Sequence, residues 1–210
     1  MKTLRLTSCL LATCLIFSAC SAKNEPPVPP APAKQAKAEK MPSKEEMMEK
    51  WKEYSTPGQE HKDLNKMIGV WKYTMKMWMD PAAAPEVTTG KSEVKWTMNG
   101  RFVEQNVSGK SMGQNFTGRA IIGFDKATKK YRSVWYDSMG TGMMIGSGTF
   151  NKDTLEESGT ASCPFKGTIP YRFNTKFTDN DHYTSEMFMT NPYTGAEERS
   201  MELQYTRSKK

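Results

Sequence analysis

Hydrophobic and polar side chains alternate along most of the chain from Gly69 onward, and this period of two constrains the fold more than any other feature. Residues 70–79 alternate Trp71, Tyr73 and Met75 with lysine and threonine, and residues 91–98 repeat the pattern around a tryptophan. Successive side chains of a β-strand point to opposite faces. Such segments therefore predict strands with one buried face.

Turns rich in glycine, asparagine and aspartate separate ten segments of this kind. The expected strands are 70–79, 91–98, 101–107, 116–124, 131–137, 143–150, 155–163, 171–177, 182–190 and 197–207. No helical pattern interrupts them, which predicts an all-β fold. Near-uniform hairpin connections favour an up-and-down, lipocalin-like barrel of about ten antiparallel strands, because closure removes the exposed sheet edges.

One or two short helices are expected before the barrel. Ser43 and Glu46 have the spacing of a capping box, in which each side chain bonds the other residue's backbone amide. Apolar residues follow at helical spacing: Met47, Met48, Trp51 and Tyr54. We expect an amphipathic helix over residues 43–58, packed against the barrel domain of residues 59–208. A second short helix places His61, Leu64 and Met67 on one face.

The first nineteen residues have the pattern of an export signal. Lys2 and Arg5 precede an apolar run over residues 6–17, and Ser18-Ala19-Cys20 resembles the lipobox of bacterial lipoproteins, with Phe17 where leucine is usual. This predicts a signal peptide over residues 1–19 and lipidation of Cys20. Simple secretion and a membrane helix are the alternatives, although the run is short of the roughly twenty residues a span needs.

Residues 20–42 are rich in proline, alanine and lysine, which favours an extended tether rather than a core. Lipoproteins with aspartate after the modified cysteine stay at the inner membrane, and this chain has Ser21 there. The resemblance therefore implies a location on the periplasmic face of the outer membrane. Cys163 is then the one cysteine left unmodified, so no disulfide framework is expected.

The formal net charge is +7, with carboxylates mixed among the lysines and no basic stripe interleaved with aromatic residues. This pattern argues against a nucleic-acid partner. The partners expected are a membrane, through Cys20, and a small apolar or fatty-acid-like ligand.

Gly69-Val70-Trp71 resembles the lipocalin Gly-x-Trp signature, in which the tryptophan closes the barrel floor under an arginine of the last strand. Arg207 or Arg199 would be that arginine. A wider pattern combines His61-x-x-Leu64, Asn99-Gly100-Arg101-Phe102, Gly123-Phe124-Asp125, Trp135-x-Asp137 and Met201-Glu202-x-x-Tyr205. The chain thus resembles the bacterial domain-of-unknown-function family 1579, of calycin-like shape, over roughly residues 59–208. The resemblance implies a fold and a habit of secretion, but no activity.

Asn99-Gly100 predicts a two-residue hairpin turn that places Arg101 on the face of Met98 and Trp96. If that face is interior, Gln105 also points inward, and Arg101 has three possible partners: a ligand carboxylate, an internal acid or water at the barrel mouth. The expected lining residues are Trp71, Tyr73, Met75, Trp96, Met98, Arg101, Gln105 and Trp135. The function expected is noncatalytic binding of a small, mostly apolar molecule.

Two other functions stay open. A barrel packed solid inside would instead bind another envelope protein through its outer surface. Met75 and Met77, with His182 or Met187 as a cross-strand partner, would suit a Cu(I) carrier. Neither a nucleophile elbow nor a three-histidine metal set occurs in the sequence, so we expect neither an enzyme nor a resident cofactor.

Overall fold

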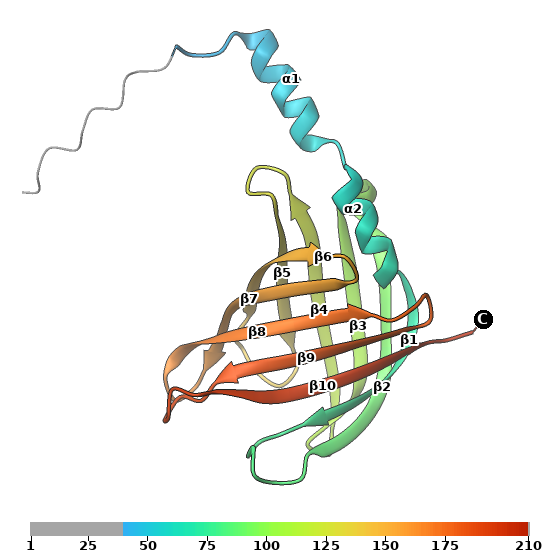
Figure 1. The fold of residues 1–210 in the computed structure, drawn as a ribbon, viewed down its shortest axis with the longest axis vertical. Helices are drawn as coiled ribbons and strands as arrows, with labels where there is room; N and C mark the ends of the chain where they lie inside the picture. Colours follow the sequence, from blue (N-terminus) through green and yellow to red (C-terminus); the bar gives the residue numbers. More distant parts are fainter. Residues whose placement is uncertain (1–39, 210) are drawn as a thin grey trace, which may run out of the picture. The chain divides into compact units, whose positions relative to one another are not determined.

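The computed structural model describes residues 40–209 of the chain. The expected signal peptide, the lipidation site Cys20 and the tether as far as residue 39 lie outside these residues. A compact unit begins at Pro42 and contains two helices, α1 and α2, and ten strands, β1 to β10 (Figure 1). The strands are β1 Gly69–Met77, β2 Glu86–Thr97, β3 Phe102–Ser111, β4 Gln114–Asp125, β5 Lys130–Asp137, β6 Met144–Asn151, β7 Thr154–Cys163, β8 Gly167–Phe177, β9 His182–Thr190 and β10 Glu197–Arg207.

The strands form a closed antiparallel barrel. Each strand pairs with its neighbours in sequence, and β1 pairs with β10 to close the ring. The expected all-β, ten-stranded, up-and-down architecture is therefore confirmed. Alternation also places the side chains as expected: Trp71, Tyr73 and Met75 of β1 are buried, while Lys72 and Thr74 between them are exposed.

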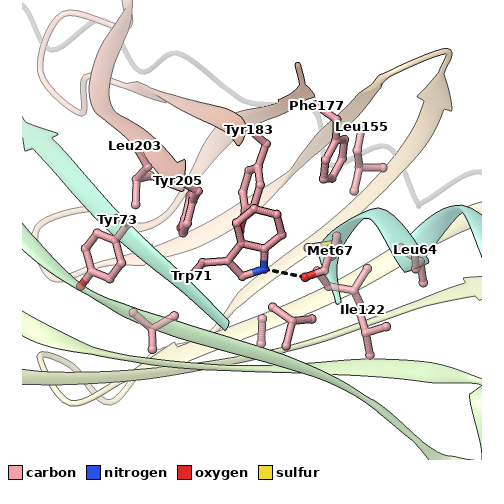
Figure 2. Close-up of a cluster of buried hydrophobic side chains, with 14 of the residues drawn as sticks. Leu64, Met67, Trp71, Tyr73, Ile122, Leu155, Phe177, Tyr183, Leu203 and Tyr205 are labelled. Carbon is pink, nitrogen blue, oxygen red and sulfur yellow. Dashed lines mark hydrogen bonds between the residues drawn. The ribbon is translucent and has the colours of Figure 1, made fainter. Parts of the chain in front are cut away.

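A tryptophan and an arginine close one end of the barrel, which we call the floor. The Trp71 indole donates a hydrogen bond from Nε1 to the Met67 carbonyl at 2.9 Å (Figure 2). Arg207 of β10 lies 4.0 Å from the centre of the Trp71 ring and donates to the Ile68 carbonyl at 2.6 Å. Gly69 has a φ of 139°, and a Cβ there would overlap the Arg207 guanidinium. Because Gly69 has no side chain, the arginine that closes the floor fits beside Trp71.

Of the two candidate arginines, Arg207 and not Arg199 closes the floor. Arg199 lies over the Trp78 ring at the other end of β10 and forms ion pairs with Glu186 and Glu202. Behind Trp71, aromatic rings fill the floor half. Tyr183 meets Trp71 edge-on at 4.6 Å between ring centres and stacks on Tyr205 at 4.1 Å.

The first helix, α1 (Lys44–Ser55), begins with the expected capping box, since Ser43 Oγ accepts from the Glu46 amide and Glu46 Oε2 accepts from the Ser43 amide. The expected packing of its apolar stripe against the barrel is wrong. No residue of α1 is buried, and Trp51 is 65% exposed. Its contacts with the barrel are polar ones at its end, such as the bond from Lys126 to the Glu53 carbonyl.

The second helix, α2 (Gln59–Asp63), and the 3₁₀ turn Leu64–Met67 do pack on the floor. His61, Leu64 and Met67 are all buried, as expected. The Gly58 amide donates to His61 Nδ1 at 3.0 Å, so the histidine packs and caps. Burial, with help from the positive charges of Lys126 and Arg101, lowers its pKa.

The turn between β2 and β3 differs from the expected two-residue hairpin. Strand pairing ends at Thr97 and Phe102, so four residues form the connection. Met98, Asn99 and Gly100 all have positive φ angles, and the turn carries a short 3₁₀ segment. Met98 is 68% exposed as a result. The prediction that Met98 and Arg101 share the inward face of Trp96 is therefore wrong.

Candidate functional site

The interior of the barrel has two unlike halves. The floor half, around Trp71, is buried. In the half towards the opposite, open end, many inward-facing side chains are only partly buried. They are Met77, Thr88, Phe116, Ser133, Trp135, Met144, Phe173, Met189 and Met201. These partly buried side chains are mainly aromatic rings and methionines, the kinds of side chain that line small-molecule sites.

The eight predicted lining residues divide between these halves. Tyr73, Met75 and Gln105 are buried and point inward, and Trp135 is partly buried in the open half. Trp71 belongs to the floor. Trp96 also lies at the floor end, where its Nε1 donates to Asn65 at 2.9 Å.

Arg101 lies in the four-residue turn at the floor end, partly exposed, and donates from Nη1 to the Met98 carbonyl at 3.3 Å. This position agrees with one of the three expected alternatives, an arginine that reaches water at the end of the barrel. It does not bring the guanidinium together with Tyr73, Met75 and Gln105.

Hydrogen bonds pair several polar side chains on the interior wall. Gln105 donates to Ser92 Oγ at 2.9 Å, and the hydroxyls of Thr175 and Ser185 lie 2.9 Å apart. The Tyr73 hydroxyl lies against Gly90 and Gly109, where a Cβ would overlap it. The Tyr73 ring can therefore lie flat against the backbone of β2 and β3, because these glycines have no side chain.

Glu157 is a buried acid of the interior that the sequence patterns above do not single out. The residue is 6% exposed, and its Oε1 has no hydrogen-bond partner within residues 40–209. Burial raises the pKa of this carboxyl, an effect that the neighbouring Ser133 hydroxyl partly offsets. Burial and the nearby Glu157 charge together raise the pKa of Tyr171 to about 12.

Glycines shape the wall beside Glu157. Gly146 pairs with Ser133 on one side and with Gly159 on the other, and Gly159 pairs with Tyr171. A Cβ on Gly146 would overlap the hydroxyls of Ser133 and Tyr171 and would lie 3.4 Å from Glu157 Oε1. The polar groups of three strands therefore meet over one bare glycine.

The ionisable side chains that face the interior are unbalanced in charge. Along the ten strands, the inward positions carry the acids Glu86, Asp137, Glu157 and Glu198 but no lysine, and Arg207 at the floor is their single arginine. The excess of lysine in the sequence thus lies on the outside. The interior of the open half is acidic although the chain is basic overall.

Loops at the open end carry exposed apolar side chains. They connect the strands over residues 78–85, 112–113, 138–143, 164–166 and 191–196, and their ionisable residues are Asp80 and Lys166. Exposed members include Met79, Met112, Met143, Phe165 and Tyr193. We call these five residues the apolar rim. Loops at the floor end instead carry many charges, from Arg101 to Asp181.

The groove most evident on the molecule lies elsewhere. It has a volume of about 780 Å³ and is lined mainly by outward-facing side chains of β2 to β5, including Lys91, Arg119 and Tyr136. It shares none of the eight predicted lining residues. Within residues 40–209 no three histidine, cysteine or acidic side chains gather as a metal site, and no helix has the length and apolarity to cross a membrane.

Comparison with known proteins agrees with the fold. A family model described as "Protein of unknown function (DUF1579)" matches residues 56–207, and the chain belongs to this family. A search of the curated proteins found no match.

Two solved structures share the barrel. Rv2717c from M. tuberculosis is 11% identical with a TM-score of 0.55, over 73% of this chain and 100% of that one. The S-type phycobiliprotein lyase CPES from Guillardia theta is 10% identical with a TM-score of 0.51, over 73% of this chain and 99% of that one. The likeness is one of fold.

Proposed function

We propose that the protein is a noncatalytic carrier that binds a small, mostly apolar molecule in the open half of its barrel. The observation that carries this proposal is the incompletely buried inner wall, where Phe116, Trp135, Phe173 and Met201 are partly buried on the inward face of a closed sheet. Aromatic and methionine side chains in a concave site bury apolar surface at about 25 cal/mol per Å². The apolar rim would give such a ligand a path to the opening.

A titration with Nile red, an apolar dye that has no N–H group, tests the proposal. We expect saturable fluorescence enhancement with the full-length protein and at least tenfold weaker binding in Trp135→Ala. Trp51→Ala is the matched control, because it removes an exposed tryptophan of α1. No saturable binding, or equal loss in both variants, would contradict a site inside the barrel.

The location of the carrier remains a proposal from the sequence alone. We propose attachment to the periplasmic face of the outer membrane through lipid on Cys20. Labelling of growing cells with an alkyne-tagged fatty acid should mark the wild-type protein and leave Cys20→Ala unmarked. Equal labelling of the two would contradict lipidation at this residue.

The apolar rim favours a second candidate function, an envelope interaction module. Contiguous exposed apolar side chains often mark protein-binding surfaces. In that case Phe165→Ser with Tyr193→Ser would abolish crosslinking to one defined partner, while Trp135→Ala would not change it. If the protein is a carrier, Trp135→Ala weakens ligand binding and the double variant of Phe165 and Tyr193 does not.

For the copper alternative, strand register brings three methionines onto neighbouring strands. Met77 of β1 lies opposite Met201 of β10, which in turn lies opposite Met187 of β9. The predicted partner His182 instead lies at the floor end of β9, beside Asp179. Stoichiometric Cu(I) binding that is lost in Met77→Leu would support this alternative.

A further inference from the structure

The carboxyl group of Glu157 identifies what kind of ligand the barrel takes. Its strand, β7, alternates Leu155, Glu157 and Ala161 on the buried face. An acid at such a position is costly without a partner, because burial removes the water that would stabilise its charge. Among the described residues, 40–209, none gives Oε1 a hydrogen bond.

Within residues 40–209, no side chain supplies the missing positive charge. None of the inward acids Glu86, Asp137, Glu157 and Glu198 forms an ion pair within residues 40–209. Arg207, the inward arginine, is already engaged by the Trp71 ring and by the Ile68 and Asn180 carbonyls.

The other three acids do have hydrogen-bond donors. Asp137 accepts from Trp135 Nε1 at 2.8 Å and from the Met139 amide. Glu86 accepts from the Met112 amide at 3.0 Å, and Glu198 accepts from Asn191 Nδ2. Among these four acids, Glu157 is therefore the one with a buried oxygen that has no donor within residues 40–209.

The position of Glu157 allows a ligand in the open half to reach it. In the strand pairing Glu157 lies opposite Phe173, which is partly exposed, and Ser133 close by is partly exposed as well. At the adjoining Gly146, the hydroxyls of Ser133 and Tyr171 occupy the space beside Glu157 Oε1, so a ligand group would meet a polar surface there.

We propose that the ligand of the barrel carries a nitrogen head group with N–H donors, such as an ammonium group, and that this group bonds the Glu157 carboxyl. This inference rests on the proposed carrier function. A buried acid paired with a cation or a strong donor is stabilised by a charge-assisted hydrogen bond. This proposal differs from the expectation of a fatty-acid-like ligand, because on the ten strands a ligand carboxylate would meet inward acids and no unpaired inward cation.

Two dansylated alkyl probes of equal chain length, one ending in an ammonium group and one in a carboxylate, test this selectivity. We expect the full-length protein to bind the ammonium probe at least tenfold more tightly. Glu157→Gln should reduce this preference to less than threefold. Glu156→Gln is the matched control and should keep it, because the adjacent Glu156 is exposed on the outer face of the same strand.

Equal affinity for the two probes, tighter binding of the carboxylate probe, or an unchanged preference in Glu157→Gln would overturn the proposal. Comparing the probes on the wild-type protein needs no variant, so the test holds even if Glu157→Gln fails to fold. Nile red separates the two levels of inference. If the dye binds and the probes show no preference, the ligand class is wrong. If neither dye nor probes bind, the carrier function itself is wrong.

Discussion

Glu157 makes the stability of the protein depend on pH in an unusual direction. Burial raises the pKa of this carboxyl above its ordinary value of 4.5. Above that pH the unfolded chain has released the proton while the native protein still holds it. The free energy of unfolding therefore falls as pH rises, until the native carboxyl also ionises. One group contributes a slope of at most about 1.4 kcal/mol per pH unit.

Urea unfolding between about pH 5 and about pH 8 measures this slope for Glu157→Gln and the wild type. We expect the variant to gain stability relative to the wild type as pH rises, because glutamine does not titrate. Taking the difference in free energy of unfolding between the two proteins removes the contribution of all other titrating groups. Among them is His61, whose lowered pKa acts in the opposite direction and costs stability as pH falls below 6.5.

Glu156→Gln, which changes the exposed neighbour on the same strand, should follow the wild type over the whole range. The reasoning is refuted if the difference in free energy between Glu157→Gln and the wild type does not change with pH. It is equally refuted if the variant loses stability relative to the wild type as pH rises, because that would mean a charge held favourably in the native protein.

Three further predictions concern the floor and the first helix. Trp71→Ala should lower the free energy of unfolding by about 3–5 kcal/mol in urea, whereas Trp51→Ala changes it by less than about 0.5 kcal/mol; equal effects would contradict the floor assignment. Gly69→Ala should cost more than about 1 kcal/mol in the same assay, because its φ is positive and its Cβ would displace Arg207; an unchanged midpoint would refute this. Ser43→Ala should speed amide exchange in α1 but leave barrel unfolding unchanged, and a destabilised barrel would mean that α1 packs on it.

Much of the fold could be predicted from local pattern, since side-chain alternation reports directly which face of a strand is buried. The pattern placed Tyr73, Met75 and Gln105 correctly on the inner face. It also gave the number of strands, because each connection has its own turn residues. Gly69-x-Trp71 indicated the floor of the barrel, and the resemblance to lipocalins required an arginine of the last strand there. Arg207 is that arginine, because it lies opposite Trp71 in the strand pairing.

The errors have physical causes that local pattern does not contain. The turn after β2 is longer than Asn99-Gly100 alone suggests, because Met98 also takes a positive φ; this moves Arg101 out of the strand. The apolar stripe of α1 shows a face suited to packing, but a stripe does not identify its partner. Glu156 and Glu157 point to opposite faces of one strand, so the pair of adjacent acids does not form a site by itself. The same alternation, read with Leu155 and Ala161, would have indicated a buried acid.

The central claim, that the barrel carries a small ligand, is tested most directly by native mass spectrometry of the full-length protein isolated from its own envelope without denaturation. The account predicts one reproducible added mass that organic solvent removes, that contains nitrogen, and that is absent from Glu157→Gln isolated in the same way. The account is contradicted if the measured mass equals that of the polypeptide plus any lipid on Cys20, with no further added mass. The same mass must also be found after incubation with an envelope extract.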